Sequence, residues 1–136
     1  MKIKMTLAVD FDGTLCSNEP DLRKFGDPII PAIETLKKLR EEHGCELILW
    51  TCREGIFLEK AVQFCHKHGL FFDAMNTNVE TPIGFGHPKI IADFYLDDRT
   101  PGWHDLDDKS RWDKIYKEIV DRMRITPSNI IKDLTP

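Results

Sequence analysis

Carboxylates and one hydroxyl follow three of the apolar runs in this chain. Asp10 and Asp12 follow the first run, Thr51 closes the run 47–50, and Asp97 and Asp98 follow the run that ends at residue 96. Strands that alternate with helices favour a parallel sheet, and parallel strands present their carboxyl ends at one edge. We therefore expect two pairs of carboxylates and a hydroxyl to lie together on one rim.

Such a rim needs positive charge. Two unit charges about 4 Å apart repel by roughly 4 kcal/mol at an effective dielectric constant of 20, so clustered carboxylates require a cation or an added proton. Oxygen ligands suit Mg²⁺, which commonly keeps open positions for water and phosphate. The carboxylates that call for such a cation are those of Asp10, Asp12, Asp97 and Asp98. Lys89, just ahead of the last apolar run, is the expected second source of positive charge for an anionic phosphoryl group.

The elements expected to position these residues alternate along the chain. Strands are predicted at 7–11, 45–51, 70–75 and 90–96, and helices at 31–43, 55–68 and 109–124, where apolar residues recur at helical spacing. Asp107 or Asp108 is expected to cap the last helix. The segment 16–28 reads as an ordered loop or small flap, and 76–88 as a long loop. The predicted fold is α/β, a three-layer Rossmann-like sandwich around a central parallel sheet.

Composition sets limits on the function. The chain has 136 residues and a net charge of -4, which fits one domain and argues against an extended nucleic-acid-binding face. Residues 1–124 are predicted to form the catalytic core, with 125–136 as a tail that makes an edge strand or a short helix. No stretch is long and apolar enough for a membrane span or an export signal. The four cysteines form no CxxC pair, which predicts reduced thiols and a cytoplasmic location.

Four motifs together resemble the haloacid dehalogenase-like (HAD) superfamily. Asp10-Phe11-Asp12-Gly13-Thr14 is similar to its first motif, Thr51 to its second, Lys89 to its third, and Tyr95-Leu96-Asp97-Asp98 to its fourth. The motifs occur in the family's order and cover roughly residues 5 to 100. Family members often carry an inserted cap domain, but 15–28 and 76–88 are too short for one. The resemblance therefore implies a small HAD-like enzyme of the capless, core-only type.

The resemblance implies a Mg²⁺-dependent phosphatase that hydrolyses a phosphate monoester. In that mechanism Asp10 is the nucleophile and forms an aspartyl-phosphate, and Asp12 is the general acid and base. Mg²⁺ would bind the Asp10 carboxylate, the Asp12 carbonyl oxygen and one of Asp97 or Asp98. Thr51 and nearby backbone N–H groups would hold the phosphoryl oxygens, and Lys89 would neutralise charge. Gly13, Thr14, Cys52 and Arg53 are the expected substrate-binding residues.

Several alternatives remain open at this point. A phosphotransferase or phosphomutase would use the same aspartyl-phosphate, and a phospho-accepting signalling domain also gathers acids, a Thr and a Lys on a parallel sheet. A metal-dependent nuclease would need neither Thr51 nor Lys89 and would favour a basic surface. An open site suits a phosphorylated small molecule or the phosphorylated end of a macromolecule, or a homo-oligomer in which a neighbouring subunit covers it.

Overall fold

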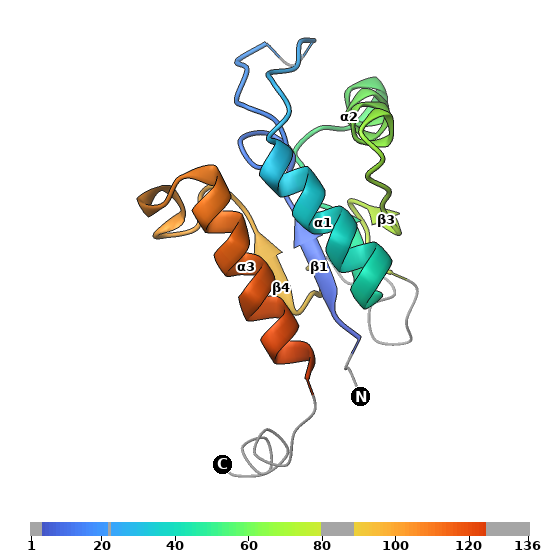
Figure 1. The fold of residues 1–136 in the computed structure, drawn as a ribbon. Coiled ribbons are helices and arrows are strands. Elements are labelled where there is room, and N and C mark those ends of the chain that lie inside the picture. The colour runs from blue at the N-terminus through green and yellow to red at the C-terminus, as the bar shows by residue number, and fades with distance from the viewer. Residues whose placement is uncertain (1–3, 22, 80–88, 125–136) are drawn as a thin grey trace.

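We describe the protein from a computed structural model that covers residues 4–21, 23–79 and 89–124. Most of the predicted loop 76–88 and the tail 125–136 lie outside the described residues. The described residues form an α/β fold with a four-stranded, all-parallel sheet flanked by helices, consistent with a Rossmann-like fold (Figure 1). No helix among them is long and apolar enough to cross a membrane.

The sheet has the strand order β3-β2-β1-β4, which places β1 at its centre. The strands are β1 (Thr6–Val9), β2 (Glu46–Leu49), β3 (Ala74–Met75) and β4 (Phe94–Leu96). Val9 lies opposite both Leu49 and Leu96, so the three strands end at the same level. This alignment is what brings the polar residues that follow them to one edge.

The three helices agree with the sequence prediction to within one residue at each end. They are α1 (Ile30–His43), α2 (Gly55–Lys67) and α3 (Asp108–Met123), with a short 3₁₀ helix η1 (Trp103–Asp105) between β4 and α3. Asp107 caps α3 by accepting a hydrogen bond from the Ser110 N–H, as predicted. Gly44 ends α1 in the left-handed conformation that glycine adopts without strain.

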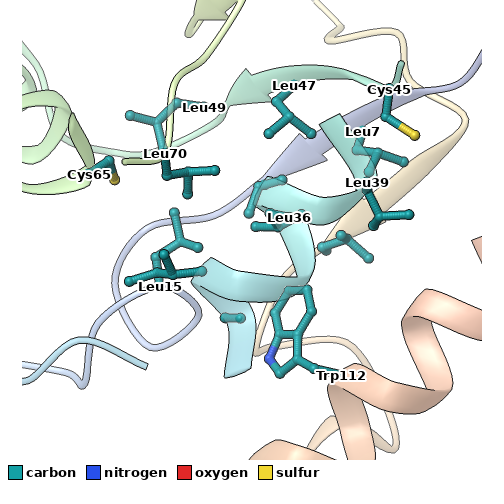
Figure 2. Close-up of a cluster of buried hydrophobic side chains, with 14 of the residues drawn as sticks. Leu7, Leu15, Leu36, Leu39, Cys45, Leu47, Leu49, Cys65, Leu70 and Trp112 are labelled. Carbon is teal, nitrogen blue, oxygen red and sulfur yellow. The ribbon is translucent and has the colours of Figure 1, made fainter. Parts of the chain in front are cut away.

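All three helices pack on the same face of the sheet. The inward residues of alternating strand positions join the apolar faces of α1, α2 and α3 in one core, which includes Leu7, Leu36, Leu47, Cys65 and Trp112 (Figure 2). The described residues supply helices to one face only, so the second helical layer of the predicted three-layer sandwich stays a prediction. The opposite face carries a smaller cluster built from sheet residues and from the described ends of the connection between β3 and β4.

Strands β3 and β4 are shorter than predicted because other groups satisfy the backbone before each of them. The Tyr95 hydroxyl donates to the carbonyl of Ile90 and accepts from the N–H of Ala92, and Asn78 Oδ1 accepts from the N–H of Ile91. The N–H of Leu70 bonds the end of α2 at Cys65. Residues 90–92 and 70 therefore lie outside the sheet ladder although their side chains are apolar.

The predicted flap forms a compact loop beside the end of β1. Cys16 bridges to Asp12 on one side and to Pro28 on the other, and the Ser17 hydroxyl accepts from the N–H of Asp27. Phe25 of this segment packs against the core.

Candidate functional site

Three carboxylates converge at the carboxyl edge of the sheet. Ligand oxygens of Asp10, Asp97 and Asp98 all lie within 4.8 Å of one another, and all three residues are half-buried. Asp10 follows β1 and still pairs with the neighbouring strand through its N–H, which donates to the Leu96 carbonyl at 2.9 Å. The end of β4 supplies the other two acids. We call Asp10, Asp97 and Asp98 the acidic cluster.

Thr14 forms hydrogen bonds to two residues of the acidic cluster, Asp10 and Asp98. Its hydroxyl donates to Asp10 Oδ2 at 3.1 Å and accepts from the Asp98 N–H at 3.1 Å, so one side chain joins the ends of two strands. Thr14 is 0% exposed. Both hydrogen-bonding roles of the Thr14 hydroxyl are therefore taken inside the protein, and the predicted contact of Thr14 with substrate stays a prediction.

Gly13 makes room for the acidic cluster. Its φ is +85°, and a Cβ built there would overlap Asp98 Oδ2 and lie 2.7 Å from Asp98 Cγ. Only a residue without a side chain allows Asp98 to approach the turn this closely. Gly13 therefore shapes the site, whereas its predicted contact with substrate stays a prediction.

The pKa of Asp10 is raised from its ordinary value to about 8. Burial is the largest cause, followed by a hydrogen bond with Asp98 and the negative charge of Asp97, while the hydrogen bond from Thr14 opposes the rise. Three acids this close do not ionise together easily, so a positive charge at this site would favour the ionised form of Asp10.

Asp12 is not part of the acidic cluster, and its carboxylate is paired with Arg53. Arg53 Nε donates to Asp12 Oδ2 at 2.9 Å, and Arg53 Nη2 donates to Asp12 Oδ1 at 2.8 Å. The Arg53 side chain is 1% exposed, whereas that of Asp12 is 27% exposed. The guanidinium of Arg53 is thus engaged with Asp12, and the predicted contact of Arg53 with substrate stays a prediction. The backbone carbonyl oxygen of Asp12 remains a candidate metal ligand, as the resemblance to the HAD superfamily implies.

Thr51 is held at the rim by a residue that the sequence analysis missed. Asn76, which follows β3, accepts from the Thr51 N–H at 2.8 Å and donates to the Arg53 carbonyl at 3.0 Å. The Thr51 hydroxyl accepts from the Arg53 N–H at 3.1 Å and keeps its own hydrogen to donate. An asparagine directly after a strand that ends at the same edge was the available signal for this role.

Lys89 and Cys52 do not join the cluster in the described structure. Lys89 is exposed, and its ammonium lies 5.9 Å from the centre of the Tyr95 ring. Among the described residues no ion pair connects Lys89 to an acid of the cluster. Cys52 is exposed next to Thr51. The assigned roles of both residues stay predictions.

The acidic cluster fits a hard divalent cation. It offers three carboxylates at close range and, within the described part of the chain, lacks a paired lysine or arginine to offset them. Oxygen donors of this kind match Mg²⁺ better than softer metals. Half-burial leaves part of each carboxylate accessible for water or a phosphate oxygen beside the cation.

Comparison with known proteins gives one informative relative. No protein-family profile and no curated protein sequence matches the chain. A solved structure described as that of a conserved protein from Bacteroides thetaiotaomicron matches with a TM-score of 0.74 and 36% sequence identity, over 94% of this chain and 98% of that chain. Its description states no activity.

Proposed function

The chain belongs to the same family as the conserved Bacteroides thetaiotaomicron protein, and we propose that it is a Mg²⁺-dependent phosphatase of the capless HAD-like type. The observation that carries this proposal is the acidic cluster. Its central member, Asp10, is half-buried, hydrogen-bonded and adjacent to two further acids at the end of the central strand. Thr14 holds Oδ2 of Asp10, and a hydrogen bond joins the Asp10 carboxyl group to Asp98.

The chemistry proceeds in two displacements. In the first, an Asp10 oxygen attacks phosphorus, the bond from phosphorus to the leaving oxygen breaks, and Asp12 supplies the proton that the leaving oxygen takes up. In the second, water gives a proton to Asp12 and attacks phosphorus, and the bond from Asp10 to phosphorus breaks. Inorganic phosphate leaves, and both carboxylates return to their starting state.

The other groups at the rim support positioning and charge. A bound Mg²⁺ would supply positive charge to the Asp10 carboxylate and the phosphoryl group, held by Asp10, the Asp12 carbonyl oxygen and one of Asp97 or Asp98. The Thr51 hydroxyl has a hydrogen left to donate and lies in a loop that Asn76 fixes, which suits a contact with a phosphoryl oxygen.

One contact favours this proposal over a phospho-accepting signalling domain. In that alternative an acid near the end of another strand would accept the phosphoryl group, and Asp73 is the nearest candidate in this chain. Its two oxygens are occupied by the Leu47 N–H at 2.8 Å and by Arg40 at 2.9 Å. Asp73 is therefore committed to tying β2, β3 and α1 together.

A screen for phosphate release tests the proposal. The protein would be incubated with a panel of phosphate monoesters, including mononucleotides and a 3′-phosphorylated oligonucleotide, in Mg²⁺ and in chelator. We expect release by the wild type in Mg²⁺ only, and none by Asp10→Asn. Release that persists in Asp10→Asn would reject Asp10 as the nucleophile. An alcohol acceptor added to the same assay separates hydrolysis from phosphoryl transfer, because a transferase would form the new ester.

A further inference from the structure

Arg53 is the most deeply buried charge in the described structure, and it points at a residue of the proposed machinery. A charged group removed from water is costly unless it is paired and hydrogen-bonded. Arg53 and Asp12 form a bidentate ion pair, in which one guanidinium nitrogen donates to each carboxylate oxygen, at 2.8 and 2.9 Å. The guanidinium lies behind the carboxylate, since the Arg53 side chain is 1% exposed and that of Asp12 is 27% exposed.

Aromatic rings hold the guanidinium in place. Its central carbon lies 5.2 Å from the centre of the Phe11 ring and 5.0 Å from that of Phe25, within range for a cation–π interaction. Phe11 stands between the two aspartates after β1, and Phe25 comes from the flap. Phe64 of α2 contacts both rings, with centroid distances of 5.6 and 5.3 Å. The position of Arg53 thus depends on the flap and on the core together.

The backbone of Arg53 is fixed as well. Its N–H donates to the Thr51 hydroxyl and its carbonyl accepts from Asn76. One residue therefore joins the Thr51 loop, the flap and the Asp12 carboxylate. Lysine could not replace it fully, because an ammonium lacks the planar fork that reaches both carboxylate oxygens.

We propose that Arg53 is a positioning residue for Asp12 and that Phe25 couples this function to the flap. The inference rests on the proposed function. Each carboxylate oxygen has two acceptor positions. Arg53 occupies one on each oxygen, and the second remains on the rim side for the leaving oxygen or the attacking water. Arg53 itself touches neither the substrate nor the reacting atoms.

The test uses p-nitrophenyl phosphate with Mg²⁺ and four variants, Arg53→Gln, Arg53→Lys, Asp12→Asn and Asp12→Asn/Arg53→Gln. We expect Arg53→Gln to lower kcat by roughly 100-fold, the size of effect that misplacing a reacting group by about 1 Å produces. KM should stay within about twofold because no substrate contact is lost. The phosphoenzyme should accumulate, since its hydrolysis needs a correctly placed Asp12. Arg53→Lys should retain part of the activity.

The double variant separates positioning from any independent role. If Arg53 acts only through Asp12, adding Arg53→Gln to Asp12→Asn should leave the residual rate of phosphoenzyme formation unchanged. A full second loss in the double variant would overturn the proposal. So would a rise in KM at unchanged kcat for Arg53→Gln, which would indicate direct substrate binding.

Arg111 offers a matched control for loss of a buried arginine. It is also buried, donates to Asp108 at 2.6 Å and lies 5.1 Å from the Trp103 ring centre, but it serves the start of α3. Arg111→Gln should lower the melting temperature and leave kcat unchanged. Equal effects of Arg111→Gln and Arg53→Gln on kcat would show that Arg53 matters only for folding and would overturn the proposal.

Phe25→Leu tests the same proposal if the Arg53 variants do not fold, because Phe25 contacts the Arg53 guanidinium. It removes one ring from the guanidinium and should lower kcat several-fold with little change in KM, whereas unchanged kcat would reject the coupling to the flap. Failures of the two proposals are distinguishable. Turnover that is absent in the wild type, or that survives Asp10→Asn, rejects the phosphatase, whereas a normal wild type with an insensitive Arg53 rejects only the role of Arg53.

Discussion

Gly13→Ala should weaken the metal site through a single methyl group. The added Cβ would overlap Asp98 Oδ2 and lie 2.7 Å from Asp98 Cγ, so the Asp98 carboxylate must move away from the cluster. The substitution also forces an L-residue into a left-handed conformation, which costs about 1–2 kcal/mol by itself. The two effects can be separated, because only the first concerns the metal.

Gly44→Ala is the matched control for backbone strain. Gly44 has φ +70°, and nothing lies within 4 Å of a Cβ built there. Both variants should therefore lose stability from strain, and at about 3–4 °C per kcal/mol for a domain of this size the control should melt about 3–8 °C below the wild type. Its response to Mg²⁺ should match that of the wild type.

The prediction concerns the increase in melting temperature that Mg²⁺ causes in each protein. At a concentration 100 times its dissociation constant, a ligand stabilises the folded state by about 2.7 kcal/mol, and a tenfold loss of affinity reduces that to about 1.4 kcal/mol. Thermal unfolding with Mg²⁺ and with chelator should thus give a shift about 4–5 °C smaller in Gly13→Ala than in the wild type or Gly44→Ala. Equal shifts in all three proteins would refute the argument that Gly13 admits Asp98 to a metal site.

Three further predictions concern the same rim. Because the pKa of Asp10 is raised to about 8, the folded, metal-free protein binds a proton that the unfolded chain has lost, so its stability should fall as pH rises from 4 to 8. Urea unfolding in chelator should show this loss in the wild type but much less of it in Asp10→Asn. Thr14→Val should cost about 1–3 kcal/mol, because it removes the acceptor of the part-buried hydrogen bond from the Asp98 N–H, while Thr14→Ser should keep most of the stability. Asn76→Ala should lower kcat and spare the Mg²⁺-induced shift in melting temperature, since Asn76 holds Thr51 and not the acidic cluster.

The convergence of Asp10, Asp97 and Asp98 was predictable from the sequence. Parallel strands end at one edge, and each of these acids directly follows an apolar strand, so topology alone brings them together. The helices were predictable for a similar reason, since their apolar faces repeat at helical spacing and glycine or aspartate marks their ends.

The connections between distant side chains were not predictable. Arg53 and Asp12 are 41 residues apart, and nothing in their local sequence distinguishes a buried pair from two groups that face a substrate. Thr14 likewise stands in a motif that suggests substrate contact, yet the end of β4 buries it. That the described helices share one face was not predictable either, because alternation of strands and helices does not specify which face each helix covers.

The most direct test of the central claim is detection of a covalent phosphoenzyme. Wild type and Asp12→Asn would be mixed with p-nitrophenyl phosphate and Mg²⁺, quenched, reduced with borohydride and analysed by peptide mass spectrometry. Borohydride converts an aspartyl-phosphate to homoserine, so we predict homoserine at position 10, with more of it in Asp12→Asn because hydrolysis is slowed. Phosphate release without modification of Asp10 in either protein, or modification at another acid, would contradict the account.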